Sequence, residues 1–243
     1  PRLKNKTRMN MLETTLDHNR GRGKIIAHIG AENMLDVIEL TRHATKVGAD
    51  GIASLPPTNF RYTQEELVNY YKIIADNTDL PLLLYAHETG NIYNFPELME
   101  ELIKIPNVIG LKCTLTDYYQ MWQIKELNNS DVNLLNGPDQ TLLCGLALGA
   151  DGGIGSTYNI MPKWFCNLYK AFHNNDMESA NKLQHKITKV ITILKRYGVI
   201  SAVKAVLTLM GYDVGAPALP SIPLTTIEQG ELKVLLKKQG IKI

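Results

Sequence analysis

The chain has 243 residues, 44% of them hydrophobic, so it can bury the core of one large domain or two ordinary ones. Its 26 basic and 24 acidic residues give a net charge of +2, which excludes the strongly basic footprint of a nucleic-acid-binding protein. The three cysteines, Cys113, Cys144 and Cys166, are widely spaced and argue against a disulfide framework or a structural zinc site. Because the sequence shows neither a membrane-spanning apolar run nor a signal-peptide pattern, we expect a cytoplasmic protein.

Strands and helices are expected to alternate along the first two thirds of the chain. A first helix is predicted over residues 1–20, and Thr63 with Glu66 has the pattern of a capping box that starts another helix. The predicted strands are 24–30, 51–56, 80–87, 108–114, 132–137 and 152–157. The other predicted helices are 31–47, 96–104, 116–127, 140–148, 162–173, 176–197, 200–211 and 226–238.

This alternation predicts right-handed βαβ units and a parallel sheet. Six such units followed by helices favour a TIM (β/α)8 barrel with a C-terminal helical extension. No Gly-x-Gly-x-x-Gly follows the first strand, which argues against a dinucleotide-binding fold. We assign residues 1–160 to the barrel and 161–243 to the last barrel helix and the extension. Since a barrel of this class needs eight strands, we expect this chain to lack the first two.

One lysine interrupts the apolar stretch Val108-Ile109-Gly110-Leu111-Lys112-Cys113-Thr114. The run is typical of a parallel strand that is buried on both faces. Desolvation there would favour the neutral amine of Lys112, which can attack a carbonyl. The alternative is a lysine at the end of a strand whose ammonium group reaches the solvent.

The reacting groups of a (β/α)8 barrel lie at the C-terminal ends of its strands. Tyr85 and Lys112 end consecutive strands, so a phenol could relay protons beside a reactive amine. The other polar or small residues at predicted strand ends are His28, Gly30, Ser54, His87, Thr114, Gly137, Asp139, Gly155, Ser156 and Tyr158. Small polar groups of this kind suit a polyhydroxylated substrate.

Several of these residues also have purely structural interpretations. Tyr85 could simply bond to the backbone, and Asp139 could cap the helix that follows it. For His28 and His87 we favour a structural role over ligand binding. Neither a metal site nor a serine-hydrolase elbow around Ser156 is predicted, because the partner residues such sites need are absent from the surrounding sequence.

Three stretches together resemble the N-acetylneuraminate lyase branch of the dihydrodipicolinate synthase / N-acetylneuraminate lyase superfamily of Schiff-base aldolases. They are Ile109 to Thr114, Ala150 to Asn159 (ADGGIGSTYN) and Asp117 to Met121 (DYYQM). Ile25 to Gly30 and Gly48 to Ile52 agree with the same pattern. The resemblance covers essentially the whole chain, in order.

The resemblance implies that Lys112 forms an imine with pyruvate or a 2-keto acid and that Tyr85 relays protons. It also implies a substrate pocket lined by Thr114, Gly137, Asp139, Gly155 and Ser156. Gln140 stands where sialic-acid lyases usually carry a glutamate that contacts the glycerol tail of the sugar. The family needs no cofactor for this reaction and is commonly tetrameric.

The sequence also departs from the family pattern. The family's Gly-Ser/Thr-Thr-Gly-Glu motif, which binds the keto-acid carboxylate, is expected to fall before residue 1. The stretch Pro56 to Phe60 places Asn59 where the family usually has a tyrosine pair. The stretch Tyr85 to Gly90 is one residue shorter than usual and lacks the arginine of the synthases, which favours the lyase branch.

Three functions therefore compete at this level. The first is an aldolase that cleaves N-acetylneuraminate or a related 2-keto-3-deoxy sugar acid to pyruvate and an aldose. The second is a condensing enzyme of the dihydrodipicolinate synthase type. The third is a non-catalytic paralogue that binds a keto acid, which Asn59 and the expected loss of the front motif would suit.

Overall fold

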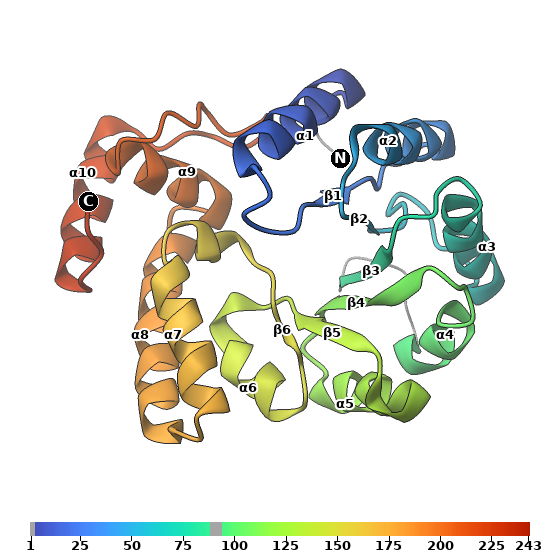
Figure 1. The fold of residues 1–243 in the computed structure, drawn as a ribbon. Coiled ribbons are helices and arrows are strands. Elements are labelled where there is room, and N and C mark those ends of the chain that lie inside the picture. Colours follow the sequence, from blue (N-terminus) through green and yellow to red (C-terminus); the bar gives the residue numbers. More distant parts are fainter. Residues whose placement is uncertain (1–2, 88–93) are drawn as a thin grey trace. The chain divides into compact units, whose positions relative to one another are not determined.

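The computed structural model describes residues 3–87 and 94–243 (Figure 1). The chain divides into two compact units. The first consists of Pro1–Leu135 and Leu148–Asp151, and the second consists of Asn136–Ala147 and Gly152–Ile243.

In the first unit, strands alternate with helices as the sequence predicts. Its strands are β1 (Ile26–His28), β2 (Gly51–Ser54), β3 (Leu82–His87), β4 (Val108–Thr114) and β5 (Asn133–Asn136), the last residue of which belongs to the second unit. Its helices are α1 (Asn5–Asn19), α2 (Met34–Val47), α3 (Gln64–Ala75), α4 (Phe95–Leu102), α5 (Tyr118–Glu126) and the 3-10 turn η1 (Leu127–Ser130). The predicted capping box at the start of α3 is confirmed, because Thr63 and Glu66 each accept a backbone N–H of the other.

The strands are hydrogen-bonded in chain order, from β1 to β6. The first four pair in parallel, and Tyr85 of β3 is the register partner of Lys112 of β4. Gly110 is needed for the next pairing, since a Cβ at this position would overlap the backbone carbonyl of Asn133 in β5. The predicted parallel sheet is thus confirmed.

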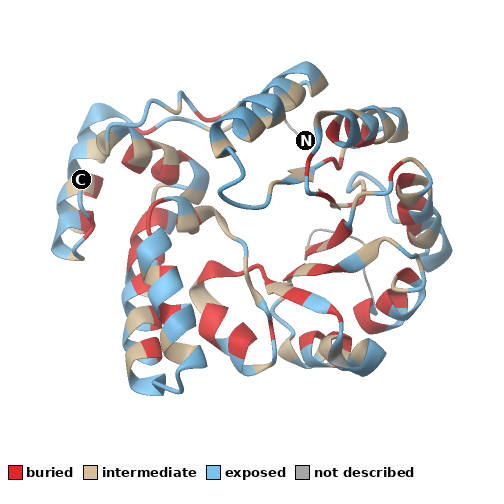
Figure 2. Cartoon of the chain, viewed as in Figure 1, coloured by how far each residue is buried: buried red, intermediate tan, exposed pale blue. Residues whose placement is uncertain are grey.

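The core of the first unit lies between the sheet and helices α2 to α5 (Figure 2). Leu82, Leu84 and Ala86 of β3, with Leu111 and Cys113 of β4, point into this core. Side chains alternate along a strand, so Tyr85 and Lys112 lie on the opposite face, away from the helices. One consequence is that β4 is not buried on both faces as predicted, because Ile109 is 43% exposed and Lys112 is half-buried.

The second unit is mostly helical. It contains η2 (Asp139–Thr141), α6 (Leu142–Ala147), β6 (Gly152–Gly153), η3 (Ser156–Asn159), α7 (Pro162–His173), α8 (Met177–Lys195), α9 (Val199–Leu209) and α10 (Thr226–Lys238). The strand expected over 152–157 was too long, because the chain turns into the 3-10 helix η3 at Ser156. The predicted run of helices after residue 161 is confirmed.

Apolar faces of α6 to α10 form the core of the second unit, with Leu168, Ile187 and Leu194 fully buried. Helix α10 starts with its own capping box, formed by Thr225 and Glu228. Among the described residues, none of the helices combines the length and apolarity required to cross a bilayer.

Candidate functional site

The first unit gathers four of the predicted strand-end residues on the sheet face that points away from its helices. Tyr85 and Lys112 are register partners on β3 and β4, and His87 and Thr114 form the next pair on this face. The side-chain nitrogen Nζ of Lys112 lies 3.9 Å from the centroid of the Tyr85 ring. In its protonated form this group is attracted by the ring quadrupole, which favours this position of the side chain.

Two histidines flank the Tyr85 ring. The His28 ring packs edge-on at 6.1 Å between centroids, and the His87 ring does so at 5.9 Å. His28 comes from β1, two strands away from Tyr85. Its register partner on β2 is Ala53, so the His28 and Tyr85 rings meet across the strand that lies between theirs. Both histidine rings therefore pack against the phenol ring of Tyr85.

His28 stays neutral in this environment. Its pKa is lowered from 6.5 to about 4, first by desolvation and then by the positive charges of Arg8 and Lys112. The Arg8 guanidinium donates a hydrogen bond of 2.6 Å to the His28 carbonyl. A neutral imidazole adds no competing positive charge beside the Lys112 amine.

Thr114 and Ser54 differ in their surroundings. The Thr114 hydroxyl is buried and has no hydrogen-bond partner among the described residues, which leaves it available for a ligand. The Ser54 hydroxyl lies on the helix side of the sheet, 2.6 Å from the Tyr70 hydroxyl of α3. Burial raises the pKa of Tyr70, so this pair is a neutral structural contact. Ser54 therefore does not join the group around Lys112.

In the second unit, Asp139 is held by hydrogen bonds rather than acting as a helix cap. Its Oδ2 accepts from the backbone N–H of Thr157 at 2.8 Å and from the Thr157 hydroxyl at 2.5 Å. Pro138 is the N-cap residue of η2, and Asp139 is the first residue of this 3-10 helix. Gly155 passes so close that a Cβ there would overlap the Asp139 carboxylate. The alternative that Asp139 caps the following helix is therefore wrong. Residue 155 is a glycine because a side chain there would collide with the Asp139 carboxylate.

Of the other predicted residues of the second unit, Gly137 and Gln140 lie next to the Asp139 turn in the chain, and Gly155 and Ser156 lie at the start of η3. Gly137 is buried, while Gln140, Gly155 and Ser156 are half-buried. The Gln140 carbonyl accepts from the Thr188 hydroxyl of α8 at 3.2 Å. The structure gives Gly137, Asp139 and Gln140 one continuous turn and places Gly155 against Asp139.

Sequence reasoning missed Thr157 and Gln184, both of which touch this turn. Gln184 is buried and bonds the backbone at Leu143 and Asp139. Thr157 stands in the stretch used for the family resemblance, but its side chain was not singled out. A buried glutamine on a helix would be the available signal, because a polar group at such a position needs partners.

One departure from the family pattern, at Asn59, can be placed in the structure. The exposed backbone N–H of Asn59 donates to the Glu32 carboxylate at 3.3 Å, and Thr58 donates to the same carboxylate. Glu88, Thr89 and Gly90 of the shortened stretch lie outside the described residues. No cluster of three or more metal-ligating side chains occurs within residues 3–87 and 94–243.

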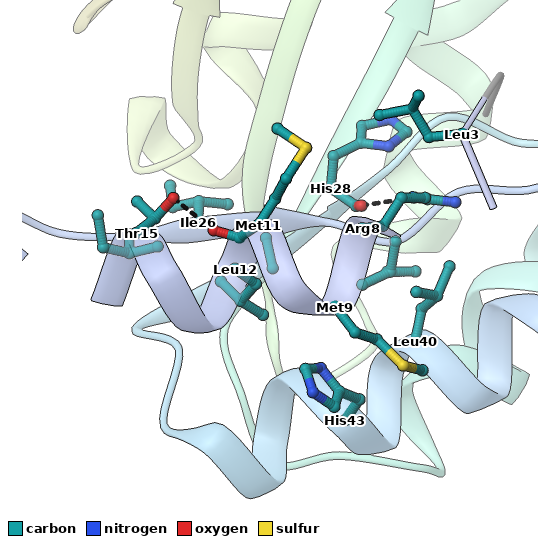
Figure 3. A pocket seen from close by; sticks show the side chains of 13 residues that line it. Leu3, Arg8, Met9, Met11, Leu12, Thr15, Ile26, His28, Leu40 and His43 are labelled. Atoms are coloured by element: carbon teal, nitrogen blue, oxygen red, sulfur yellow. Dashed lines mark hydrogen bonds between the residues drawn. The ribbon is translucent and has the colours of Figure 1, made fainter. Parts of the chain in front are cut away.

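The first unit also has an open pocket of about 270 Å³ formed by α1, β1 and α2 (Figure 3). Its lining is mainly apolar, with Met9, Leu12 and Leu40 among the contributing side chains. His28 borders it, whereas Lys112 and Tyr85 do not. We therefore do not assign the chemistry of the site to this pocket.

The sequence of this chain is similar to that of known proteins along almost its whole length. Residues 1–239 match the model of the Dihydrodipicolinate synthetase family. The chain belongs to this family. It is 36% identical over 232 residues to N-acetylneuraminate lyase 2 of Escherichia coli O6:H1, which covers 95% of this chain and 75% of that protein. The family resemblance seen in the sequence is thereby confirmed.

Solved structures show the same fold. The N-acetylneuraminate lyase of Proteus mirabilis matches with a TM-score of 0.93 and 26% identity, over 99% of this chain and 83% of its own. A dihydrodipicolinate synthase of Bacillus anthracis matches with a TM-score of 0.90 and 27% identity, over 97% of this chain and 81% of its own. Because both enzyme types share the fold, the fold alone does not separate them.

Proposed function

We propose that this chain is a Schiff-base aldolase, a carbon–carbon lyase that cleaves N-acetylneuraminate or a related 2-keto-3-deoxy sugar acid to pyruvate and an aldose. The single observation that carries the proposal is the Lys112 amine above the Tyr85 ring on neighbouring strands. The relative from Escherichia coli is named as a lyase of this kind and supports the choice of substrate.

The first step would be imine formation at Lys112. The Nζ atom attacks the keto carbon of the open-chain substrate, a carbon–nitrogen bond forms, and the carbinolamine loses water to give a protonated imine. The half-buried position of Lys112 suits this step, since the side chain is packed yet still reachable. The neutral His28 helps because it adds no repulsive charge next to the cationic imine.

The second step would be carbon–carbon cleavage. The bond between C3 and C4 of the substrate breaks, and its electron pair moves toward the imine nitrogen to form an enamine. As this bond breaks, the C4 hydroxyl loses its proton and becomes the carbonyl group of the aldose, and we assign the role of the general base that accepts this proton to Tyr85. Protonation of the enamine at C3 and hydrolysis of the imine then release pyruvate and restore the Lys112 amine.

Substrate binding is proposed for the remaining predicted residues. These residues are Thr114, Gly137, Asp139, Gln140, Gly155 and Ser156. The Thr114 hydroxyl, which has no hydrogen-bond partner among the described residues, would contact a hydroxyl of the sugar acid. The assignment of these residues rests on the family resemblance.

Finer features of the protein remain predictions. We expect a (β/α)8 barrel with a C-terminal helical extension, of which the six described strands are a part. We also expect a cytoplasmic homotetramer that requires no cofactor. Light scattering coupled to size exclusion would measure the oligomeric state, and activity that survives exhaustive dialysis against a chelator would test the cofactor prediction.

Trapping the imine tests the proposed function directly. The chain is incubated with pyruvate and borohydride, and the mass of the Lys112 peptide is measured. We expect a reduced pyruvate adduct on Lys112 in the parent chain and none in Lys112→Arg, because a guanidinium does not form an imine. Lys104→Arg, at an exposed ion pair with Glu101, is the matched control and should be trapped normally. A parent chain with no adduct would overturn the proposal.

The synthase alternative has support from the Bacillus anthracis structure. A coupled assay with pyruvate and aspartate semialdehyde separates it from the lyase, since only a synthase condenses the two. Imine trapping with turnover of aspartate semialdehyde and not of a sugar acid would establish this second function. Reversible pyruvate binding without trapping would instead indicate a non-catalytic protein.

A further inference from the structure

The turn that carries Asp139 and Gln140 is anchored to helix α8 by two polar side chains. The buried Gln184 accepts from the backbone N–H of Leu143 at 2.9 Å, and its amide donates to the Asp139 carbonyl at 3.4 Å. One helical turn later, the Thr188 hydroxyl donates to the Gln140 carbonyl at 3.2 Å. Gln184 also donates to the Thr188 hydroxyl at 3.3 Å, so the two act as a connected pair.

Gln184 takes the place of a backbone hydrogen bond that a regular helix would form. The carbonyl of Asp139 and the N–H of Leu143 are four residues apart, so in a continuous α-helix they would bond to each other. Here the Gln184 amide stands between them and satisfies both. A side chain inserted into the helical hydrogen-bond ladder bends the backbone at that point. The start of α6 is thereby held as the separate turn η2, from which Asp139 projects.

The Asp139 side chain is fixed independently at its other end. Thr157 supplies two hydrogen bonds to Oδ2, and Oδ1 occupies the space that a Cβ at residue 155 would fill. Thr157 and Gln184 thus fix the two ends of one residue, the first through the carboxylate and the second through the backbone. Oδ1 is the carboxylate oxygen that receives no hydrogen bond from Thr157.

We propose that Gln184 and Thr188 are positioning residues that set the affinity for the sugar part of the substrate, by fixing the turn that presents Asp139 and Gln140. This inference rests on the proposed function, because it takes these two residues as substrate contacts. Neither Gln184 nor Thr188 touches the substrate in this scheme. Their substitution therefore changes sugar recognition and leaves imine formation at Lys112 intact.

The experiment compares Gln184→Met, which keeps the length of the side chain, with Gln229→Met as the matched control. Gln229 donates to the Leu224 carbonyl near the start of α10 and does not contact the Asp139 turn. We expect the KM for the sugar acid to rise about tenfold in Gln184→Met, with a smaller fall in kcat, because small displacements of a positioning group weaken productive binding strongly. The pyruvate concentration that half-saturates trapping of Lys112 should stay the same.

Thr188→Val and Thr192→Val form a second, milder pair. Thr192 is exposed, and its hydroxyl bonds only to the carbonyl of Thr188 within the same helix. Thr188→Val should raise the KM for the sugar acid by roughly threefold, in line with the loss of one neutral hydrogen bond, while Thr192→Val should not. If Gln184→Met fails to fold, this pair decides the question.

Imine trapping and the KM for the sugar acid together distinguish three outcomes. A parent chain that forms no adduct on Lys112 removes the proposed function itself. A parent chain that is trapped, together with variants whose thermal midpoint or kcat falls while the KM for the sugar acid stays constant, overturns the positioning role and leaves the aldolase. A rise in that KM with unchanged trapping supports both.

Discussion

The first and second units hold their candidate residues in different ways. In the first, Lys112 and Tyr85 are register partners in a parallel ladder, so the backbone hydrogen bonds of two strands fix their separation. In the second, Asp139 projects from a 3-10 turn that is held by a few hydrogen bonds, two from Thr157 to the carboxylate and one from Gln184 to the backbone carbonyl. The strand β6 of that unit is only two residues long.

The two arrangements suit different functions, catalysis in the first unit and substrate recognition in the second. Bond-making groups need a fixed geometry, which a continuous ladder provides at many points at once. A turn held by a few side-chain bonds, each worth about 1 kcal/mol, can change its shape through one substitution. We therefore expect substitutions in the first unit to affect chemistry and those in the second to affect recognition.

Of the substitutions that test this comparison, we expect Tyr85→Phe to have the largest effect, on kcat. The ring that packs under Lys112 and against His28 is kept, and only the hydroxyl is lost. We expect kcat to fall by about 10²–10⁴-fold, the usual contribution of a general base, while pyruvate is still trapped on Lys112. Tyr119→Phe, on an exposed ring, is the control and should keep full activity. Equal kcat in both variants would remove Tyr85 from the mechanism.

Gly155→Ala tests the second unit. The new Cβ would overlap the Asp139 carboxylate and push it away from Thr157. We expect a loss of about 1–3 kcal/mol in the free energy of unfolding and a rise of the KM for the sugar acid, with trapping unchanged. Denaturant melts and steady-state kinetics measure the two effects. Gly230→Ala in α10 meets open space and should be stabilising instead, because alanine is the better helix former.

A smaller effect is expected from pH at His28. Its folded pKa of about 4 lies below the ordinary value of 6.5, so the unfolded chain binds more protons between these values. The contribution of His28 to stability is thus complete above pH 6.5 and is lost as the pH falls toward 4. In His28→Gln, the thermal midpoint should change less with pH over this window than it does in the parent protein. His18→Gln, on the exposed helix α1, should follow the parent curve.

The smallest effects come from the two capping boxes, one in each unit. Thr63→Ala and Thr225→Ala each remove a side-chain acceptor at a helix N-terminus. We expect each to cost about 1 kcal/mol in the free energy of unfolding without changing KM or kcat. Chemical denaturation gives the first quantity. A change in KM for either variant would show that the comparison between units depends on overall stability rather than on the residues of the site.

Much of the first unit followed from local patterns. The spacing of apolar residues predicted the strands β1 to β5 and the helices between them, and Thr63 with Glu66 predicted the start of α3. The pairing of Tyr85 with Lys112 was also expected, because consecutive parallel strands end at the same edge of a sheet. Less followed for the second unit, where the strand expected over 152–157 shrank to two residues and Asp139 proved not to cap a helix.

The sequence by itself determined the alternation of elements, the helix caps and the lysine strand, because each of these is encoded by residues within a few positions of one another. Only the tertiary structure decided that Ser54 turns to the helices, that the His28 ring packs against Tyr85 from two strands away, and that Gln184 anchors a turn 45 residues earlier. Such contacts depend on which side chains meet once the backbone is packed. Their partners are far apart in the chain, and no local periodicity records them.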